Sequence, residues 1–112
     1  MKLKLEGFFF VGPLLKDYEK LFFDIASKAP AVIFCRCLPT QKAIITEGLK
    51  KYSKSTVCCI GDGGNDVGMI QSSDVGIGIV GKEGLQAALA SDFSVKEFRL
   101  IQIIKNLKCF CA

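Results

Sequence analysis

One stretch decides the fold of this chain: VCCIGDGGNDVGMI, residues 57–70. It starts as an apolar run, passes through glycines and acidic residues that dominate turns, and ends with apolar residues at helical spacing. This order predicts a buried strand at Val57–Ile60, a tight polar turn, and a helix from Asn65 to about Gln71. Because ligands of open α/β sheets bind at the carboxyl ends of strands, the turn is a candidate metal and phosphate site. The alternative for so short a motif is a polar turn that binds nothing.

Strand-like and helix-like segments alternate on both sides of this stretch. We predict strands at Phe8–Val11, Ala31–Cys35, Val75–Val80 and Asp92–Val95, and helices at Asp17–Ala29, Pro39–Tyr52, Glu83–Ala90 and Lys96–Lys108. On the second helix the apolar spacing assigns Ala43, Ile44, Leu49 and Tyr52 to the core. The alternation predicts an α/β fold in which a mainly parallel sheet carries helices on both faces. A length of 112 residues fits one domain or part of one.

Composition argues for a packed domain and against nucleic-acid binding. Half of the residues are hydrophobic (50%), so the chain can form a core. The net charge is +4, but the lysines are spread along the chain and only Arg36 and Arg99 are arginines. A nucleic-acid binder would need a clustered basic face, which this spacing does not supply. We therefore expect no nucleic-acid partner.

The cysteines and the hydropathy pattern bear on the cellular compartment. There are six cysteines: Cys35, Cys37, Cys58, Cys59, Cys109 and Cys111. Their Cys-x-Cys and Cys-Cys spacings differ from the two-residue gap of zinc sites, so we expect reduced thiols and a cytosolic setting. No stretch approaches the roughly 20 apolar residues of a membrane span.

A lysine extends the candidate site. Lys42 lies near the start of the predicted helix after Ala31–Cys35, and the carboxyl ends of neighbouring parallel strands meet at one edge of a sheet. Lys42 can therefore face the same crevice as Asp62. An ammonium group beside the carboxylates of Asp62 and Asp66 suits a phosphoryl group bridged to Mg²⁺, to which Asn65 can donate a hydrogen bond.

Several motifs in order resemble one known family. They are PTQK at residues 39–42, GDGGND at 61–66 and VGIGI at 75–79, with flanks CRCL at 35–38, VGMIQ at 67–71, GKEGLQA at 81–87 and ASDFS at 90–94. Together they resemble the C-terminal part of the phosphorylation domain of P-type ATPases, within the haloacid-dehalogenase-like superfamily. The flanks are similar to the P4 subfamily, the phospholipid-transporting flippases. The resemblance covers about residues 14–104 and implies a Rossmann-like fold.

The resemblance also implies roles for individual residues. Asp62 is expected to bind Mg²⁺, and Asp66 to support that metal and orient the loop. Asn65 is expected to contact the phosphate, Lys42 to hold the phosphoryl group, and Arg36 to lie on the nucleotide side. In such enzymes ATP phosphorylates an aspartate, and hydrolysis of the aspartyl-phosphate drives a phospholipid to the cytosolic leaflet of a Golgi, endosomal or plasma membrane.

Some family features do not occur in residues 1–112, which we therefore interpret as a single partial domain. The sequence holds no Asp-Lys-Thr-Gly-Thr motif with the nucleophilic aspartate, and none of the nucleotide-binding, actuator or transmembrane parts. We expect these parts as partners of the chain, and we expect the chain alone not to hydrolyse ATP. Two alternatives stay open: a small haloacid-dehalogenase-like phosphatase, whose Asp-x-Asp motif is also missing, and a non-catalytic module that binds Mg²⁺ or phosphate.

Overall fold

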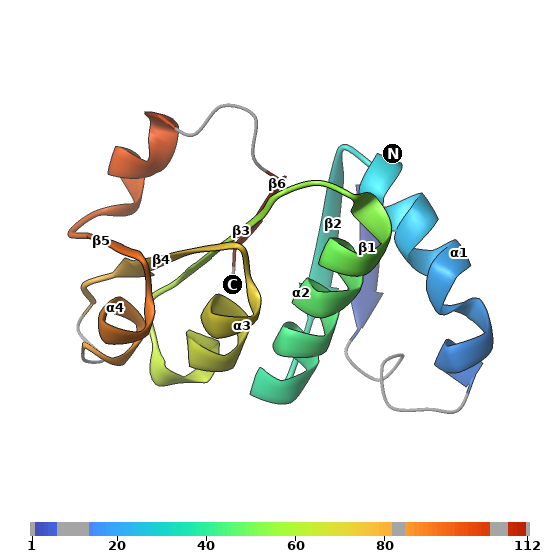
Figure 1. The fold of residues 1–112 in the computed structure, drawn as a ribbon, viewed down its shortest axis with the longest axis horizontal. Coiled ribbons are helices and arrows are strands. Elements are labelled where there is room, and N and C mark those ends of the chain that lie inside the picture. The colour runs from blue at the N-terminus through green and yellow to red at the C-terminus, as the bar shows by residue number, and fades with distance from the viewer. Residues whose placement is uncertain (1, 7–13, 82–84, 104–107, 112) are drawn as a thin grey trace.

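A computed structural model describes residues 2–6, 14–81, 85–103 and 108–111, with side-chain surroundings for residues 18–81 and 85–101. Strands and helices alternate through most of the chain (Figure 1). In order they are β1 (Lys2–Glu6), α1 (Leu14–Lys28), β2 (Ala31–Cys35), α2 (Pro39–Ser53), β3 (Val57–Gly61), the 3₁₀ helix η2 (Gly64–Asp66), α3 (Val67–Ser72), β4 (Val75–Ile79), α4 (Gln86–Ala90), β5 (Phe93–Val95), the 3₁₀ helix η3 (Phe98–Ile103) and β6 (Lys108–Cys111).

The strands form two parallel sheets. Strands β1 and β2 pair with each other, and the larger sheet has the order β5-β4-β3-β6. Every described pair of strands is parallel. Strands joined through helices, as β3, β4 and β5 are, form the crossover units that parallel pairing requires. The predicted α/β class with a mainly parallel, Rossmann-like sheet is confirmed.

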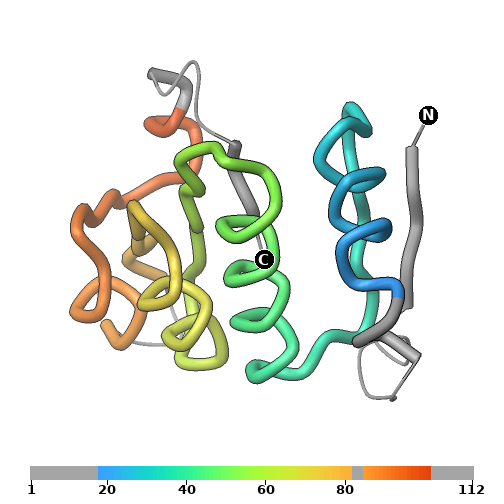
Figure 2. Tube along the Cα trace, turned by 45° about the vertical axis from the view of Figure 1, so that its right-hand side comes forward, coloured from blue at the N-terminus to red at the C-terminus, as the bar shows by residue number. Residues whose placement is uncertain are grey.

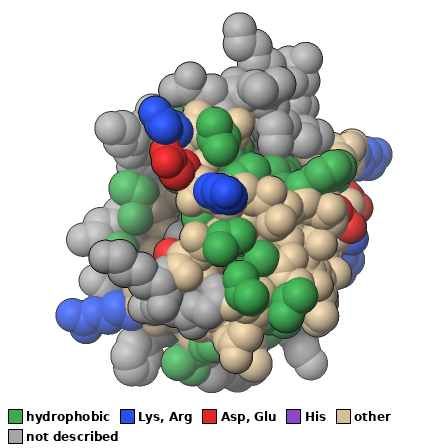
Figure 3. Space-filling model, turned by 90° about the vertical axis from the view of Figure 1, so that its left-hand side faces the viewer, with side chains coloured by type: hydrophobic (Ala, Val, Ile, Leu, Met, Phe, Trp, Pro, Cys, Tyr) green, Lys and Arg blue, Asp and Glu red, His purple; other side chains and the backbone are tan. Residues whose placement is uncertain are grey.

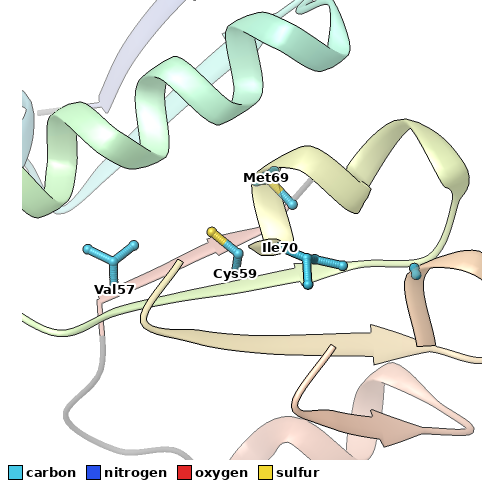
Figure 4. Close-up of a cluster of buried hydrophobic side chains, with 5 residues drawn as sticks. Val57, Cys59, Met69 and Ile70 are labelled. Carbon is cyan, nitrogen blue, oxygen red and sulfur yellow. The ribbon is translucent and has the colours of Figure 1, made fainter. Parts of the chain in front are cut away.

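Strand β3 is an inner strand of the larger sheet, and both of its faces are buried. All five of its residues are buried, and their side chains alternate between two clusters. On one face, Val57 and Cys59 pack with Met69 and Ile70 of α3 and with Ala87 of α4 (Figure 4). The helices therefore cover this face through a continuous apolar contact.

The opposite face of β3 has a different cover. Cys58 and Ile60 pack with Ile77 of β4, and Ile101 of η3 lies against them. Both faces of the sheet are thus covered, as predicted, but the second is covered by a 3₁₀ helix in the described residues. Burial of apolar side chains on two faces explains why β3 is a continuous apolar run without alternation.

Helix α2 lies between the two sheets (Figure 2), and packs against both α1 and α3. The α1 contact is close: Phe23 of α1 stacks on Tyr52 of α2 with ring centroids 5.6 Å apart. A side chain at Gly48 would overlap the Phe23 ring. The close approach fixes α2, whose first turn carries Lys42.

The strand predicted at Phe8–Val11 lies outside the described residues, and β1 at Lys2–Glu6 is a strand that was not predicted. The single helix predicted at Lys96–Lys108 is wrong, because this segment begins as η3 and β6 starts at Lys108. Strand β6 pairs with the free edge of β3, so backbone pairing overrides the amphipathic pattern of the tail.

The core side of α2 also differs from the prediction. Ile44 is 48% exposed, whereas Ile45, Thr46 and Gly48 are buried. Because α2 packs against α1 on one side and α3 on the other, its buried positions do not follow the single stripe that sequence spacing suggests.

The elements α4, β5 and η3 form one face of the molecule (Figure 1). Hydrophobic side chains gather on this face (Figure 3), and Leu89 is 82% and Phe93 65% exposed. Strand β5 is the edge of the larger sheet. Among the described residues, no helix is long and apolar enough to cross a membrane.

Candidate functional site

The loop after β3 is closed on itself by the side chain of Asp66. Asp66 Oδ2 accepts hydrogen bonds from the backbone N–H groups of Asp62 at 3.2 Å and Gly63 at 3.4 Å. Asp66 is only 2% exposed, and a Cβ on Gly61 would overlap its side chain. The absence of a side chain at Gly61 therefore lets the carboxylate fold under the loop and fix its shape.

The other oxygen of Asp66 pairs with Lys42. Lys42 Nζ lies 2.7 Å from Asp66 Oδ1, and the two side chains are 14% and 2% exposed. A charge-assisted hydrogen bond at this distance and burial is stronger than one between neutral groups. The predicted proximity of Lys42 to the loop is therefore observed, with Asp66 as its ion-pair partner. The pair joins α2 to the loop although β2 and β3 lie in different sheets.

The start of α2 fixes the position of Lys42. Pro39 is the first residue of the helix, and the Gln41 side chain accepts a hydrogen bond from the backbone N–H of Leu38 at 2.8 Å. One turn further, buried Thr46 donates to the carbonyl oxygen of Lys42 at 3.0 Å and lies 3.4 Å from Cys59 Sγ of β3. Proline at the first position is typical of a helix start, and the Gln41 bond satisfies the backbone N–H just before it.

Asp62 and Asn65 lie on the outer side of the same loop. Both are exposed, in contrast to buried Asp66 between Lys42 and the loop backbone. The Asp62 carboxylate is a hard oxygen ligand that solvent and ions can reach. Sites for Mg²⁺ commonly use one or two carboxylates together with waters and substrate phosphate. The donor set at this loop fits such a site, with Asp62 as the accessible carboxylate.

Arg36 lies apart from this constellation. It follows β2, is exposed, and adopts a left-handed backbone with φ 57°. Within residues 18–81 and 85–101 it forms no ion pair. The next residue, Cys37, lies within electrostatic range of Lys42, and burial raises the pKa of its thiol. The segment after β2 therefore approaches the site at Cys37, and burial favours the protonated form of the Cys37 thiol.

The cysteines in the described part divide into two groups. Cys58 and Cys59 are fully buried in β3, and Cys35 and Cys37 are half-buried. No group of three or more His, Cys, Asp or Glu side chains in residues 18–81 and 85–101 is arranged to hold a metal ion. The thiols of β3 pack within the two core clusters, and that of Cys59 also contacts the Thr46 hydroxyl.

Sequence reasoning missed one residue at this loop. A Cβ on Gly64 would overlap Oε1 of Gln86, so the Gln86 side chain lies directly on the loop. Another segment beyond β4 also approaches, because a Cβ on Gly81 would lie 3.7 Å from Asp62 Cβ. The consecutive glycines at 63 and 64 were a signal that something packs closely there, but a glycine does not name its neighbour.

The side of the sheet where the strands begin, which we call the amino edge, holds two more aspartates in a different arrangement. Asp74 Oδ2 accepts from the Val57 N–H at 2.9 Å, and Asp92 Oδ2 accepts from the Gly76 N–H at 2.7 Å. The N–H of each aspartate returns a bond to the carbonyl of the same residue. Each aspartate thus joins the starts of two neighbouring strands.

Lys50 completes this edge. Its Nζ lies 3.2 Å from Asp74 Oδ1, and both side chains are more than a third exposed (37% and 38%). The Val57 bond, followed by Lys50, holds the pKa of Asp74 below its ordinary value. Asp74 and Asp92, which directly precede β4 and β5 in the sequence, therefore have backbone partners at the amino ends of strands.

The fold and the site define a class: a Rossmann-like α/β segment with a charged loop at the carboxyl end of its central strand. No protein-family model matches the chain. Curated relatives do. The chain is 58% identical over 88 residues to the phospholipid-transporting ATPase NEO1 of Saccharomyces cerevisiae, and 64% identical over 77 residues to neo1 of Schizosaccharomyces pombe. It is 58% identical over 87 residues to the probable phospholipid-transporting ATPase IIB of Homo sapiens.

These similarities cover 69–79% of the chain, which spans about 8% of the length of the relatives. The resemblance to P4-type ATPases is therefore confirmed, and the chain corresponds to a segment of the phospholipid-transporting ATPase family.

Proposed function

We propose that this chain is the Mg²⁺- and phosphate-binding segment of an ATP-driven phospholipid transporter. The observation that carries the proposal is the Lys42–Asp66 pair at 2.7 Å beneath a loop that exposes Asp62 and Asn65. A cation, a metal-binding carboxylate and an amide then occupy one edge of the sheet. The names of the similar proteins supply the class of transported substrate, a phospholipid.

Each side chain has a role that its position supports. Asp62, exposed, ligates Mg²⁺. Asp66, whose oxygens already bind Lys42 and two backbone N–H groups, supports the metal site by orienting the loop. Asn65 contacts the phosphate. Lys42 neutralises phosphoryl oxygens, and an ammonium group has three N–H donors of which the Asp66 bond uses one.

The chemistry at this edge is phosphoryl transfer from ATP to an aspartate of the same enzyme and hydrolysis of the resulting aspartyl-phosphate. Such reactions depend on positioning and charge neutralisation rather than on covalent work by these residues. Bound Mg²⁺ supplies positive charge against the developing negative charge of the phosphoryl group. Arg36, exposed after β2, faces the nucleotide side in this proposal.

The remaining domains of such a transporter are the partners of this segment. They comprise the nucleotide-binding and actuator domains and the membrane helices, and the segment works on the cytosolic side of a Golgi, endosomal or plasma membrane. Because residues 1–112 hold no Asp-Lys-Thr-Gly-Thr motif, this chain alone forms no phosphoenzyme. An acid-stable phosphate on the purified 112-residue chain after incubation with Mg²⁺ and ATP would refute this statement.

The test uses a full-length transporter that carries this segment. Asp62→Asn and Lys42→Ala should each abolish lipid-stimulated ATP hydrolysis, because one removes the metal ligand and the other the phosphoryl cation. Lys20→Ala, at an exposed position of α1, is the matched control and should leave turnover unchanged. Normal turnover in either site variant would contradict the proposed roles.

A further inference from the structure

The side chain of Gln86 occupies the space over Gly64. Gln86 is the first residue of α4, and Gly64 is the first residue of η2 in the loop after β3. A Cβ built on Gly64 would overlap the Gln86 Oε1 atom and lie 3.1 Å from Cδ and 3.8 Å from Nε2 of the same side chain. The carboxamide group of Gln86 therefore rests directly on the backbone of the loop.

Backbone conformation does not explain the glycine at this position. Gly64 is not in the left-handed region, and it opens a 3₁₀ turn that other residues adopt without strain. Its exposed position would also tolerate a methyl group if Gln86 were elsewhere. The missing side chain at residue 64 serves the contact with Gln86.

The helix that carries the exposed Gln86 side chain is fixed from behind. Ala87, the next residue of α4, is fully buried in the cluster with Cys59 and Met69. A Cβ on Gly78 of β4 would overlap the backbone at Ala87 and Ala88, so helix and strand are in close backbone contact. A side chain on a helix that packs this tightly starts from a fixed backbone position and can support the loop it contacts.

The loop is therefore held from two sides. On the α2 side, the Lys42–Asp66 pair fixes its buried half. On the α4 side, Gln86 lies on Gly64, and the two exposed residues Asp62 and Asn65 flank this contact. The spacing between a metal-binding carboxylate and a phosphate-binding amide depends on the backbone that joins them.

We propose that Gln86 is a positioning residue of the Mg²⁺ site: its side chain holds Gly64 so that Asp62, which binds the ion, keeps its position relative to Asn65, which contacts the phosphate. The proposal rests on the function proposed for this loop. Gln86 itself need not touch the metal. Groups that orient metal ligands without binding the metal commonly change affinity when they are removed.

The experiment titrates the 112-residue chain with Mg²⁺ and follows the backbone amide signals of the loop by NMR. Gln86→Ala should weaken Mg²⁺ binding by about tenfold. Gly64→Ala should weaken it as well, because the new methyl group displaces the Gln86 carboxamide. The double variant Gly64→Ala/Gln86→Ala should bind better than the product of the two single losses predicts, because the methyl group fills the space that the glutamine vacates.

Matched controls separate this contact from general damage. Gly68→Ala introduces the same methyl group in α3, where a Cβ would meet only Ala43 at 3.9 Å. Gln71→Ala removes the same side chain from an exposed position of α3. Both controls should keep wild-type affinity. Gln86→Met, which keeps the length of the side chain without the carboxamide, should restore most of the affinity lost in Gln86→Ala.

The outcomes separate this inference from the proposed function. If the wild-type chain binds no Mg²⁺ at Asp62, the proposed function fails and the inference fails with it. If the wild-type chain binds Mg²⁺ and Gln86→Ala binds it equally well, only the inference is overturned. Strict additivity of the Gly64 and Gln86 substitutions would also overturn it, because the two side chains would then act independently.

Discussion

Helix α2 (Pro39–Ser53) carries one lysine–aspartate pair near each end, and the two pairs differ in burial and partners. At the carboxyl edge of the sheet, Lys42 and Asp66 are 2.7 Å apart and almost wholly buried. At the amino edge, Lys50 and Asp74 are 3.2 Å apart and more than a third exposed. Because α2 runs antiparallel to the strand that follows it, its first turn lies at one edge of the sheet and its last turn at the other.

The difference shows that the same type of residue pair, lysine with aspartate, can serve two purposes. Asp74 bonds the start of β3 and so belongs to the scaffold that aligns the strands. Asp66 bonds the loop that carries Asp62, so its pair with Lys42 orients groups that solvent can reach. Both are aspartates next to apolar runs of the sequence. Their position at the amino or at the carboxyl ends of the strands decides whether they align strands or orient the loop.

The largest expected effect is loss of the buried pair. Lys42→Met leaves the Asp66 carboxylate, 2% exposed, without its cation, and we expect a loss of about 3 kcal/mol in the free energy of unfolding. Lys42→Met/Asp66→Asn should recover part of this loss, because no buried charge remains. Urea denaturation measures both, with Lys20→Met as control. An equal loss of unfolding free energy in Lys50→Met and Lys42→Met would contradict the difference between the two pairs.

A smaller effect is expected at the amino edge. Asp74→Ala removes the acceptor of the Val57 N–H and the partner of Lys50, and we expect a loss of about 1 kcal/mol. Asp92→Ala removes the equivalent bond to Gly76 and should cost a similar amount. Urea denaturation measures both losses, and changed Mg²⁺ binding of either variant in an NMR titration would contradict the assignment of this edge to the scaffold.

Acidic pH should reduce the contribution of Asp74, at the amino edge, to the free energy of unfolding. The Val57 bond and Lys50 lower the pKa of Asp74 in the folded protein. The stability gained from ionised Asp74 is complete above the ordinary aspartate pKa of about 3.9, and it is lost as pH falls through that value toward the lower folded pKa. Urea midpoints measured from neutral to acidic pH should therefore fall less steeply below about pH 4 in Asp74→Asn than in wild type. Identical slopes would mean that Asp74 does not contribute.

Salt should produce the smallest difference. The exposed Lys50–Asp74 pair is screened by ions, whereas the buried Lys42–Asp66 pair is shielded from them. High salt should reduce the coupling energy of the exposed pair by a few tenths of a kcal/mol at most, as measured by double-mutant cycles at low and high salt. The coupling energy of the buried pair should stay constant. A larger decrease in the buried pair than in the exposed pair would contradict this expectation.

Much of the fold follows from local pattern. The apolar run Val57–Ile60 and the glycines and aspartates after it predict a strand and a turn, and Pro39 predicts the start of α2 at that residue. These features depend on hydrophobic period and on backbone preferences of single residues, which a sequence displays directly. The juxtaposition of Lys42 with the loop was also predicted, but from strands assumed to share one sheet. Strands β2 and β3 lie in different sheets, and packing of α2 against α3 brings Lys42 to the loop.

Other features depend on contacts between distant segments. Strand β6 was missed because its pairing with β3 is set by an unpaired sheet edge and not by the period of the tail. Ile44 was assigned to the core, but packing of α2 against two neighbours left it 48% exposed. Asp66 was expected beside the metal, and its observed bonds to Lys42 and the loop backbone could not be read from a motif. Gln86 lies 22 residues beyond Gly64 and gives no local sign of the contact.

The most direct test of the central claim compares the two edges in one Mg²⁺ titration of the 112-residue chain by NMR. The account predicts saturable shifts of the backbone amides of Asp62, Gly63 and Asn65, no shifts at Asp74 or Asp92, and loss of all shifts in Asp62→Asn. Equal shifts at both edges, or unchanged Mg²⁺ binding in Asp62→Asn, would contradict it.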